Sequence, residues 1–581
     1  MKQRSLFIAL SHIMIGSVLL GACAAPAATP ASTVAPAPTA VVFPTATTAA
    51  PTAAPTAAPT TAAATAAPAT EAPTAAPAGP TKGGTLTIVD NVDYSTLDPF
   101  KQTWTNPALG FEFDGLIVYK TDYSGFTPNL AESWTVSADK LSVTFKLRQG
   151  IKFHDGTPFD AAAVVWNIKR NIDKTVASVA CDVLCGLVTD AVAVDDHTVT
   201  LKLSAPSAAL FDALPVMVSP TTFEKVGADN FGQNPQGAGT GPYMVTEQVA
   251  NDHRTLKRNP DYAWAPTYYD NKGAAYPETV VVKQLSDEAT TFAALQTGQV
   301  QVAPLAPQFL DQARKDPNIT VVQGLDNGIQ YIGFNTQFPP FDNKNVRQAI
   351  GYAINRDELV KVGWNGEADP LYGPLSPSQF GYSQAAETEA RKQAFNTDTA
   401  KNMLAAEGWV PGSDGTLAKG GKKLEIRFIL PPDDRSKRLA ETIQSQLADI
   451  GIKLTLAPEE IAALKDETKK GTHQMFLLYM SLPDPRILCF QFCSANINGT
   501  DRTRFKNDAL DKALAAMNAE VDPEKRKALV EAAELIIIDQ RPEIPFAVQH
   551  TFAAYRKDQV GGMKFDAIGV ALYMDAYLLK P

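Results

Sequence analysis

Histidines and the motifs that build enzyme active sites are scarce in this sequence. Only six histidines occur in 581 residues, and none is spaced as H-x-x-x-H or H-E-x-x-H, which leaves a dedicated zinc site without support. No G-x-S-x-G segment is present, so the nucleophile elbow of the α/β-hydrolases is excluded as well. Acidic residues are plentiful, but no spacing singles out an acid and base couple. The sequence therefore predicts no catalytic residue, no metal site and no cofactor.

Excess positive charge and long apolar runs are also missing. The formal net charge is −10 at pH 7, and a surface of that sign is poorly suited to nucleic acid or to anionic lipid headgroups. After the first 22 residues, no apolar run reaches the length of a transmembrane helix. We therefore expect no nucleic-acid partner, and no membrane span beyond the N-terminal segment.

The N-terminus has the pattern of an export signal. Lys2 and Arg4 precede an apolar segment, Leu6–Ala22, that is short for a membrane span. The segment ends in "LGAC", which resembles the lipobox of bacterial lipoproteins, where the signal is removed and the cysteine is acylated. We therefore predict a signal peptide over residues 1–22 and lipidation at Cys23. An uncleaved anchor helix and an ordinary secreted chain are the alternatives.

Residues 23–82 have almost nothing to bury. Between Ala24 and Pro80 the chain is nearly all Ala, Pro and Thr, and Glu71 is its sole charged residue. Such a composition is typical of an extended, partly polyproline II tether, which as a coil would span roughly 40 Å. An O-glycosylated stalk is the alternative and would have the same mechanical effect. In either case the folded part is held at a distance from the membrane.

The four remaining cysteines form two C-x-x-x-C pairs. Outside the cytoplasm an even number of cysteines indicates disulfides, and four cysteines allow three pairings. On a helix, Cβ atoms four residues apart are about 5 to 6 Å from each other, whereas a disulfide needs about 3.5 to 4.5 Å. A bridge within a pair therefore requires a loop or a distorted turn. The candidates are Cys181, Cys185, Cys489 and Cys493.

After residue 82 the sequence alternates between strand and helix patterns. In "LSVTFKLRQGIKF" the apolar residues Val143, Phe145 and Leu147 alternate, and Gln149-Gly150 predicts a hairpin turn back into a second strand. The segment "KNVRQAIGYAINRDELVKVGW" has helical spacing and predicts one long amphipathic helix. About 500 residues of such mixed structure, without a repeat, indicate an α/β protein of two or three domains.

Eight segments, in order, resemble the family 5 extracellular solute-binding proteins of ABC importers. They cover nearly everything after residue 82, which makes the resemblance specific. The segments are "GGTLTI" with "STLDP", "PNLAESWTVSADKLSVTFKLRQGIKFHDGTPFDAAAV", "GTGPY", "KRNPDY", "ALQTGQV", "YIGFNTQFPPFDNKNVRQAIGYAINRDELV", "DTAKNMLAAEGW" and "PEIPF".

The resemblance implies a two-lobed α/β fold, periplasmic-binding-protein-like, with an extra subdomain in lobe one. The lobes close on a solute like a flytrap. We expect lobe one at residues 83–330, lobe two at 331–544 and the return to lobe one at 545–581. The implied protein is a monomeric, lipid-anchored extracytoplasmic receptor that captures a small peptide or other oligomeric solute and delivers it to ABC permease subunits. A tethered secreted hydrolase and a cell-surface interaction protein are the rival interpretations.

The resemblance also suggests residues for the ligand site. Asp93, after the first strand, is placed where peptide-binding members have a site residue. In those members an aspartate four residues before the proline of a D/E-P pair holds the peptide ammonium, but here that position is Ser481. Either Asp93 or Asp484 supplies the charge, or the ligand has no free amino terminus. Tyr479 is a candidate wall of the site and Gln549 is a further candidate.

The segment "FHDGTPF" invites a catalytic interpretation. His154 and Asp155 are adjacent, as in a catalytic or metal-binding pair. Asp-Gly, however, is a turn dipeptide, and we interpret the motif as part of the scaffold.

Overall fold

The structure is a computed structural model that describes residues 79–90, 96–101 and 109–580. The predicted lipidation site Cys23, the tether as far as residue 78 and the candidate ligand residue Asp93 lie outside the described residues. No helix in the described ranges is both long enough and apolar enough to cross a membrane.

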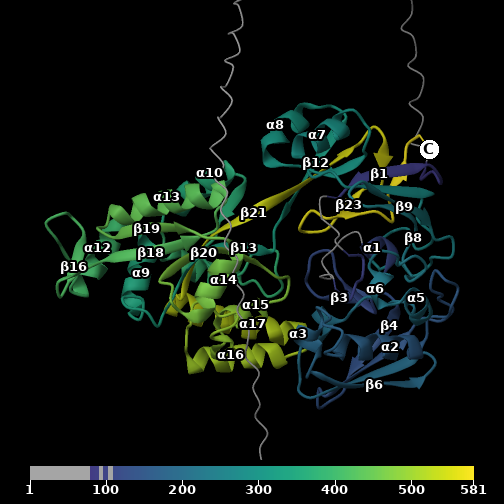
Figure 1. The fold of residues 1–581 in the computed structure, drawn as a ribbon, viewed down its shortest axis with the longest axis horizontal. Coiled ribbons are helices and arrows are strands. Elements are labelled where there is room, and N and C mark those ends of the chain that lie inside the picture. The colour runs from purple at the N-terminus through teal and green to yellow at the C-terminus, as the bar shows by residue number, and fades with distance from the viewer. Residues whose placement is uncertain (1–78, 91–95, 102–108, 581) are drawn as a thin grey trace, which may run out of the picture. The chain divides into compact units, whose positions relative to one another are not determined.

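The long strand β21 (Glu543–Arg556) joins the two halves of the main sheet (Figure 1). Its first half pairs with β13 (Gly328–Phe334) and its second half pairs with β12 (Ile319–Leu325). Its first six residues are buried, as expected for a strand covered on both faces. The strand order is β19 (Lys453–Pro458), β18 (Glu425–Leu430), β20 (Met475–Ser481), β13, β21, β11 (Val302–Pro304), β1 (Thr85–Val89), β10 (Thr279–Lys283), β9 (His253–Arg258) and β8 (Tyr243–Val249), with β12 and β14 (Ala368–Pro370) also on β21.

We call the elements up to β12, together with the short strands after β21, lobe one, and the elements from β13 to α17 lobe two. The chain crosses between the lobes at Asp326 and Asn327, which separate β12 from β13. It crosses again within β21, where the partner strand changes from β13 to β12. Two such connections allow the lobes to move as units about a shared hinge.

Lobe one contains a separate four-stranded sheet of order β4-β5-β7-β6. Val143, Phe145 and Leu147 all point into its core, as their alternation predicts. The predicted hairpin at Gln149-Gly150 is wrong, because β5 is flanked by β4 and β7 and has no free edge for the following segment. The strands are β4 (Ala131–Val136), β5 (Ser142–Leu147), β6 (Val188–Asp195) and β7 (Thr198–Leu203).

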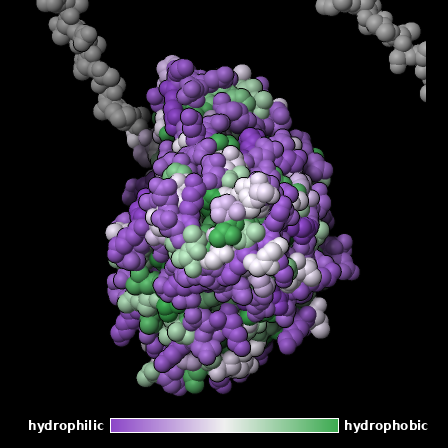
Figure 2. Space-filling model, turned by 90° about the vertical axis from the view of Figure 1, so that its left-hand side faces the viewer, coloured by the Kyte–Doolittle hydropathy of each residue, from purple (hydrophilic) through white to green (hydrophobic). Residues whose placement is uncertain are grey.

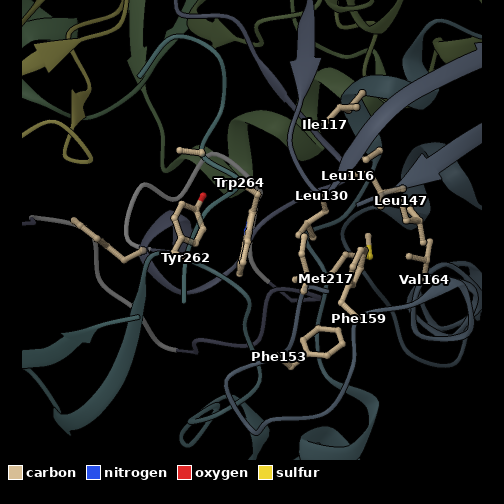
Figure 3. Close-up of a cluster of buried hydrophobic side chains, with 14 of the residues drawn as sticks. Leu116, Ile117, Leu130, Leu147, Phe153, Phe159, Val164, Met217, Tyr262 and Trp264 are labelled. Carbon is tan, nitrogen blue, oxygen red and sulfur yellow. The ribbon is translucent and has the colours of Figure 1, made fainter. Parts of the chain in front are cut away.

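The core of lobe one continues from this sheet to the loops that follow it. Figure 3 shows Leu147 and Val164 of the small sheet and its helix α2 in one cluster with Phe153, Phe159 and Met217. Helix α2 (Ala161–Ile172) begins at Asp160, whose side chain accepts from the backbone N of Ala163. The other lobe-one helices are α1 (Leu109–Glu112), α3 (Cys181–Leu184), α4 (Ala209–Ala213), α5 (Pro220–Val226), α6 (Ala228–Phe231), α7 (Glu288–Gln296) and α8 (Leu310–Lys315).

Helices cover the sheet of lobe two and bury its apolar side chains. The predicted long helix over residues 344–364 is wrong as a single element: it divides at Asn355, whose side chain caps a new helix by accepting from the backbone N of Glu358. The helices are α9 (Lys344–Ala353), α10 (Arg356–Trp364), α11 (Gln384–Arg391), α12 (Thr397–Ala406), α13 (Asp434–Ala448), α14 (Ile461–Lys470), α15 (Ile487–Phe492), α16 (Asp508–Ala519) and α17 (Pro523–Gln540).

Small two- and three-stranded sheets complete the fold. They are β2 (Ile117–Tyr119) with β3 (Phe126–Pro128), β15 (Val410–Pro411) with β16 (Leu417–Lys419) and β17 (Lys422–Lys423), β22 (Val560–Gly561) with β25 (Tyr577–Leu578), and β23 (Lys564–Phe565) with β24 (Ala571–Leu572). Figure 2 views the side on which Figure 1 labels α12 and β16, and its surface is mostly hydrophilic with small scattered hydrophobic patches.

Candidate functional site

A cavity of about 900 Å³ is lined by residues of both lobes. This volume is in the range of small-molecule sites, which are concave and mostly apolar with a few placed polar groups. Lobe one contributes most of the wall, including the turn between β23 and β24. Lobe two contributes the segment from Ser481 to Phe490, and the crossing between the lobes contributes Asp326 and Asn327.

Tyrosines dominate the wall that lobe one contributes. Each ring offers an apolar face and a hydroxyl that donates or accepts a hydrogen bond. Burial raises the pKa of every one of these hydroxyls, so they remain protonated at neutral pH. The seven residues are Tyr119, Tyr123, Tyr243, Tyr262, Tyr268, Tyr269 and Tyr573.

A buried carboxylate, Asp114, supports part of this wall. It accepts hydrogen bonds from Asn129 (3.0 Å), Thr240 (3.1 Å), Tyr262 (3.3 Å) and the indole of Trp264 (2.9 Å). Burial raises the pKa of Asp114, and these four donors oppose the shift. The rings of Tyr262 and Trp264 lie side by side, 4.6 Å between centroids (Figure 3). Asp114 therefore holds the orientation of two aromatic side chains.

The crossing residue Asp326 brings two of the predicted site residues together. Its Oδ2 accepts from the hydroxyl of Tyr479 (2.8 Å) and from Nε2 of Gln549 (2.6 Å), and its Oδ1 accepts from the backbone N of Gly328 (3.0 Å). Tyr479 belongs to β20, and Gln549 lies in the middle of β21, where the partner strand changes from β13 to β12. Burial and the Asp326 carboxylate raise the pKa of Tyr479. One carboxylate therefore links both connections between the lobes to β20.

Ser481 lies beside the same crossing. Its hydroxyl donates to Oδ1 of Asn327 at 2.8 Å, and both residues line the cavity. Positions 481 and 327 thus contribute a hydroxyl and an amide to the wall, beside the carboxylate of Asp326.

Asp484 has a different environment. It accepts two hydrogen bonds from the guanidinium of Arg526 (2.6 and 2.7 Å) and one from the backbone N of Arg486 (2.8 Å). It is buried and is not among the described residues that line the cavity. Burial by itself would raise the pKa of Asp484, but the charge and hydrogen bonds of Arg526, together with the backbone N and the charge of Arg486, outweigh this effect and the pKa is lowered.

A buried ion pair joins the two lobes beside the cavity. Nε of Arg486, at the start of α15, donates to Oδ2 of Asp212 in α4 at 2.8 Å, and Asp212 also accepts from the hydroxyl of Tyr119. The guanidinium lies over the ring of Phe490, 5.0 Å from its centroid. Burial raises the pKa of Asp212, and the nearby charge of Asp484 raises it further. Arg486 is the one basic residue in the described cavity lining.

The sequence of this chain matches a model of a known protein family, which indicates what kind of site this is. The model of the bacterial extracellular solute-binding proteins, family 5, middle part, matches residues 125–496, which is well over half of the chain. The chain belongs to family 5 of the bacterial extracellular solute-binding proteins.

Known proteins resemble this chain in sequence and in fold. The glutathione-binding protein GsiB of Escherichia coli O1:K1 / APEC is 30% identical over 498 residues, which are 81% of this chain and 90% of that protein. HbpA2 from Haemophilus parasuis has a TM-score of 0.75 at 26% identity and covers 85% of this chain and 100% of its own. The periplasmic binding protein DppA from Helicobacter pylori, solved with the peptide STSA, has a TM-score of 0.67 at 26% identity, covering 86% and 99%.

These relatives confirm three predictions: the family, the two-lobed α/β fold, and a function in binding rather than catalysis. His154 agrees with the scaffold interpretation, because its Nε2 bonds to the carbonyl of Gly241 at 3.0 Å and burial lowers its pKa to about 4. Asp155 accepts from the hydroxyls of Ser219 and Thr222 at 2.5 and 2.7 Å, which ties the turn to α5.

The disulfides of this family 5 member are local and lie at the edges of the cavity. Cys181 bonds to Cys185 and Cys489 bonds to Cys493, each with a Cα–Cα distance of 4.6 Å. In both pairs the second cysteine leaves the helix with an extended backbone, which confirms the predicted distortion. Asp182 and Phe490, enclosed by the two bridges, line the cavity.

Sequence reasoning missed Asp326, Arg486 and the tyrosine wall. The segment around "NPDYAWAPTYYD" supplies Tyr262, Tyr268 and Tyr269, and its unusual aromatic density was an available signal. Asp326 carried no such signal, because its importance comes from partners 153 and 223 positions away in the sequence.

Proposed function

We propose that this protein is a monomeric, lipid-anchored extracytoplasmic receptor that captures a peptide or similar oligomeric solute and delivers it to an ABC import permease. The cavity of about 900 Å³ between the lobes carries the proposal, because its size suits a short peptide. The printed names of relatives, a glutathione-binding protein and a protein solved with a four-residue peptide, support the same ligand class.

The proposed ligand contacts follow the chemistry of the wall. The tyrosine rings would hold apolar side chains and the hydroxyls would bond to peptide groups. Ser481 offers a further polar contact, and Tyr479 and Gln549 would support the site through their bonds to Asp326. Contacts of Asp93 and Asp484 with the ligand remain predictions.

The proposed arrangement along the chain is a signal at residues 1–22, a tether at 23–82, lobe one at 83–330 with its return at 545–581, and lobe two at 331–544. The proposed lobe boundaries fall within β13 and β21, close to the two crossings between the lobes. Acylation of Cys23 would hold the receptor on the outer face of the cell membrane. A tether of that composition would leave the lobes free to reach a permease.

Calorimetry tests the proposal with the purified chain and a panel of di- to pentapeptides that includes glutathione. We expect at least one peptide to bind with micromolar affinity or better, and mass spectrometry to recover it unchanged. Tyr268→Ser in the cavity wall should weaken binding at least tenfold, whereas the matched control Tyr276→Ser, outside the lining, should leave it unchanged. Turnover of the peptide, or a panel without any binding, would refute the proposed function.

A further inference from the structure

The described cavity lining carries an excess of negative charge. Four aspartates and one arginine belong to it, and that arginine, Arg486, is already paired with Asp212. A charge that is partly removed from water is stabilised by an opposite charge, so this wall favours a solute with a cationic group. The four acidic residues are Asp114, Asp182, Asp326 and Asp566.

Hydrogen-bond capacity distinguishes these carboxylates. A carboxylate has about four acceptor positions, and Asp114 already accepts from four donors. Asp182 is exposed on the short helix α3, where water screens an ion pair. Asp566 accepts from the hydroxyl of Tyr123 and from two backbone N atoms of its own turn. It belongs to lobe one, so a cation bound there need not contact lobe two.

Asp326 has as many donors as Asp566 but differs in position, because it lies at the crossing between the lobes. It is half-buried, and its three described partners, Tyr479, Gln549 and the backbone of Gly328, are all neutral donors. One acceptor position, on Oδ1, is left by this count. Because Tyr479 and Gln549 both bond to Oδ2, they hold the carboxylate in a fixed orientation at the cavity wall.

We propose that Asp326 binds the cationic amino group of the solute and thereby selects ligands with a free ammonium. This inference rests on the proposed function, since it assigns a role within the same cavity. Asp326 lies on one connection between the lobes and is bonded to Gln549 on the other. An ammonium at this carboxylate is therefore held at the hinge, in contact with one connection and one hydrogen bond away from the other.

The experiment compares trialanine and glutathione with their N-acetylated forms by calorimetry. The wild-type chain should bind at least one free-amino form about 10- to 150-fold more tightly than its acetylated form, the range of one charge-assisted hydrogen bond. Asp326→Asn should remove this preference by weakening the free-amino form alone. The variant keeps an oxygen for Gly328, and the hydroxyl of Tyr479 can turn to accept from the new amide, whereas Nε2 of Gln549 loses its acceptor.

Two further variants separate a binding role from a structural one. Asp566→Asn, which removes the other cavity carboxylate with three donors, should leave the preference intact. Adding Ser481→Asp to Asp326→Asn should restore it, because residue 481 bonds to Asn327, the neighbour of Asp326.

Each outcome is decisive. A wild-type chain that binds both forms equally, a loss of both forms in Asp326→Asn, or a loss of the preference in Asp566→Asn overturns the role of Asp326 while the receptor function stands. If neither form of either peptide binds, the proposed function fails as well.

Discussion

The ion pair between Arg486 and Asp212 should stabilise the closed form of the receptor. The two residues belong to different lobes, their side chains are 11% and 0% exposed, and the bond from Nε to Oδ2 is 2.8 Å long. In an open form the guanidinium would be hydrated, so replacement of Asp212 by Asn would leave it without an opposite charge from lobe one only when the lobes are closed.

The magnitude follows from this burial. Removing one partner of a buried ion pair costs about 3 to 5 kcal/mol. Asp484, which accepts from the backbone N of Arg486 at 2.8 Å, keeps a negative charge nearby, so the lower limit of about 3 kcal/mol applies. In the variant, closure of the lobes costs this additional free energy, which reduces the affinity of a solute that binds the closed form. We therefore expect Asp212→Asn to raise Kd on the order of 100-fold.

Calorimetry with the tightest peptide of the panel measures the effect, and small-angle scattering with and without peptide measures closure. The matched control is Lys140→Met, because the pair of Lys140 and Glu520 also joins the lobes, at 3.0 Å, but is more exposed. A more exposed pair contributes about 1 kcal/mol or less, so Kd should change less than about fivefold. An Asp212→Asn variant that binds and closes like the wild type would refute the reasoning.

Three other predictions concern stability and location. Burial raises the pKa of Glu112 from 4.5 to about 8, so between pH 5 and 8 the folded state binds more protons than the unfolded state. As the pH rises, this group therefore lowers the free energy of unfolding by about 1.4 kcal/mol per pH unit. Denaturant titrations of Glu112→Gln at several pH values should lack this contribution to the pH dependence, and an unchanged pH dependence would contradict the assignment. Replacing Cys489 and Cys493 by Ser should lower the free energy of unfolding by about 2 kcal/mol, the value for so short a loop, as measured by chemical denaturation under oxidising conditions. Under reducing conditions, where both bridges are open, the wild type and the variant should have the same stability. Cys23→Ala should release a folded, ligand-binding chain into the medium in cell fractionation, whereas retention on the membrane would mean an uncleaved anchor.

Local features of the fold could be predicted because they depend on residues a few positions apart. The alternation of Val143, Phe145 and Leu147 places one face of β5 in the core, and the side chain of Asp160 caps α2 three residues away. Predictions failed where a strand or helix from another part of the chain determined the local structure. The residues after Gln149 did not return onto β5, because β4 and β7 already occupied both of its edges.

The sequence by itself determined the family, the mixed α/β class and the absence of a carboxylate at Ser481, since each is a matter of residue identity and order. It left three pairings of four cysteines and several possible anchors for a ligand. Only the tertiary structure decided between the pairings, by releasing Cys185 and Cys493 from their helices into an extended backbone. It also brought Asp326 to its partners in β20 and β21, and Arg486 to Asp212, 274 positions away. Such contacts depend on how separate strands and helices pack, and no local pattern in the sequence encodes them.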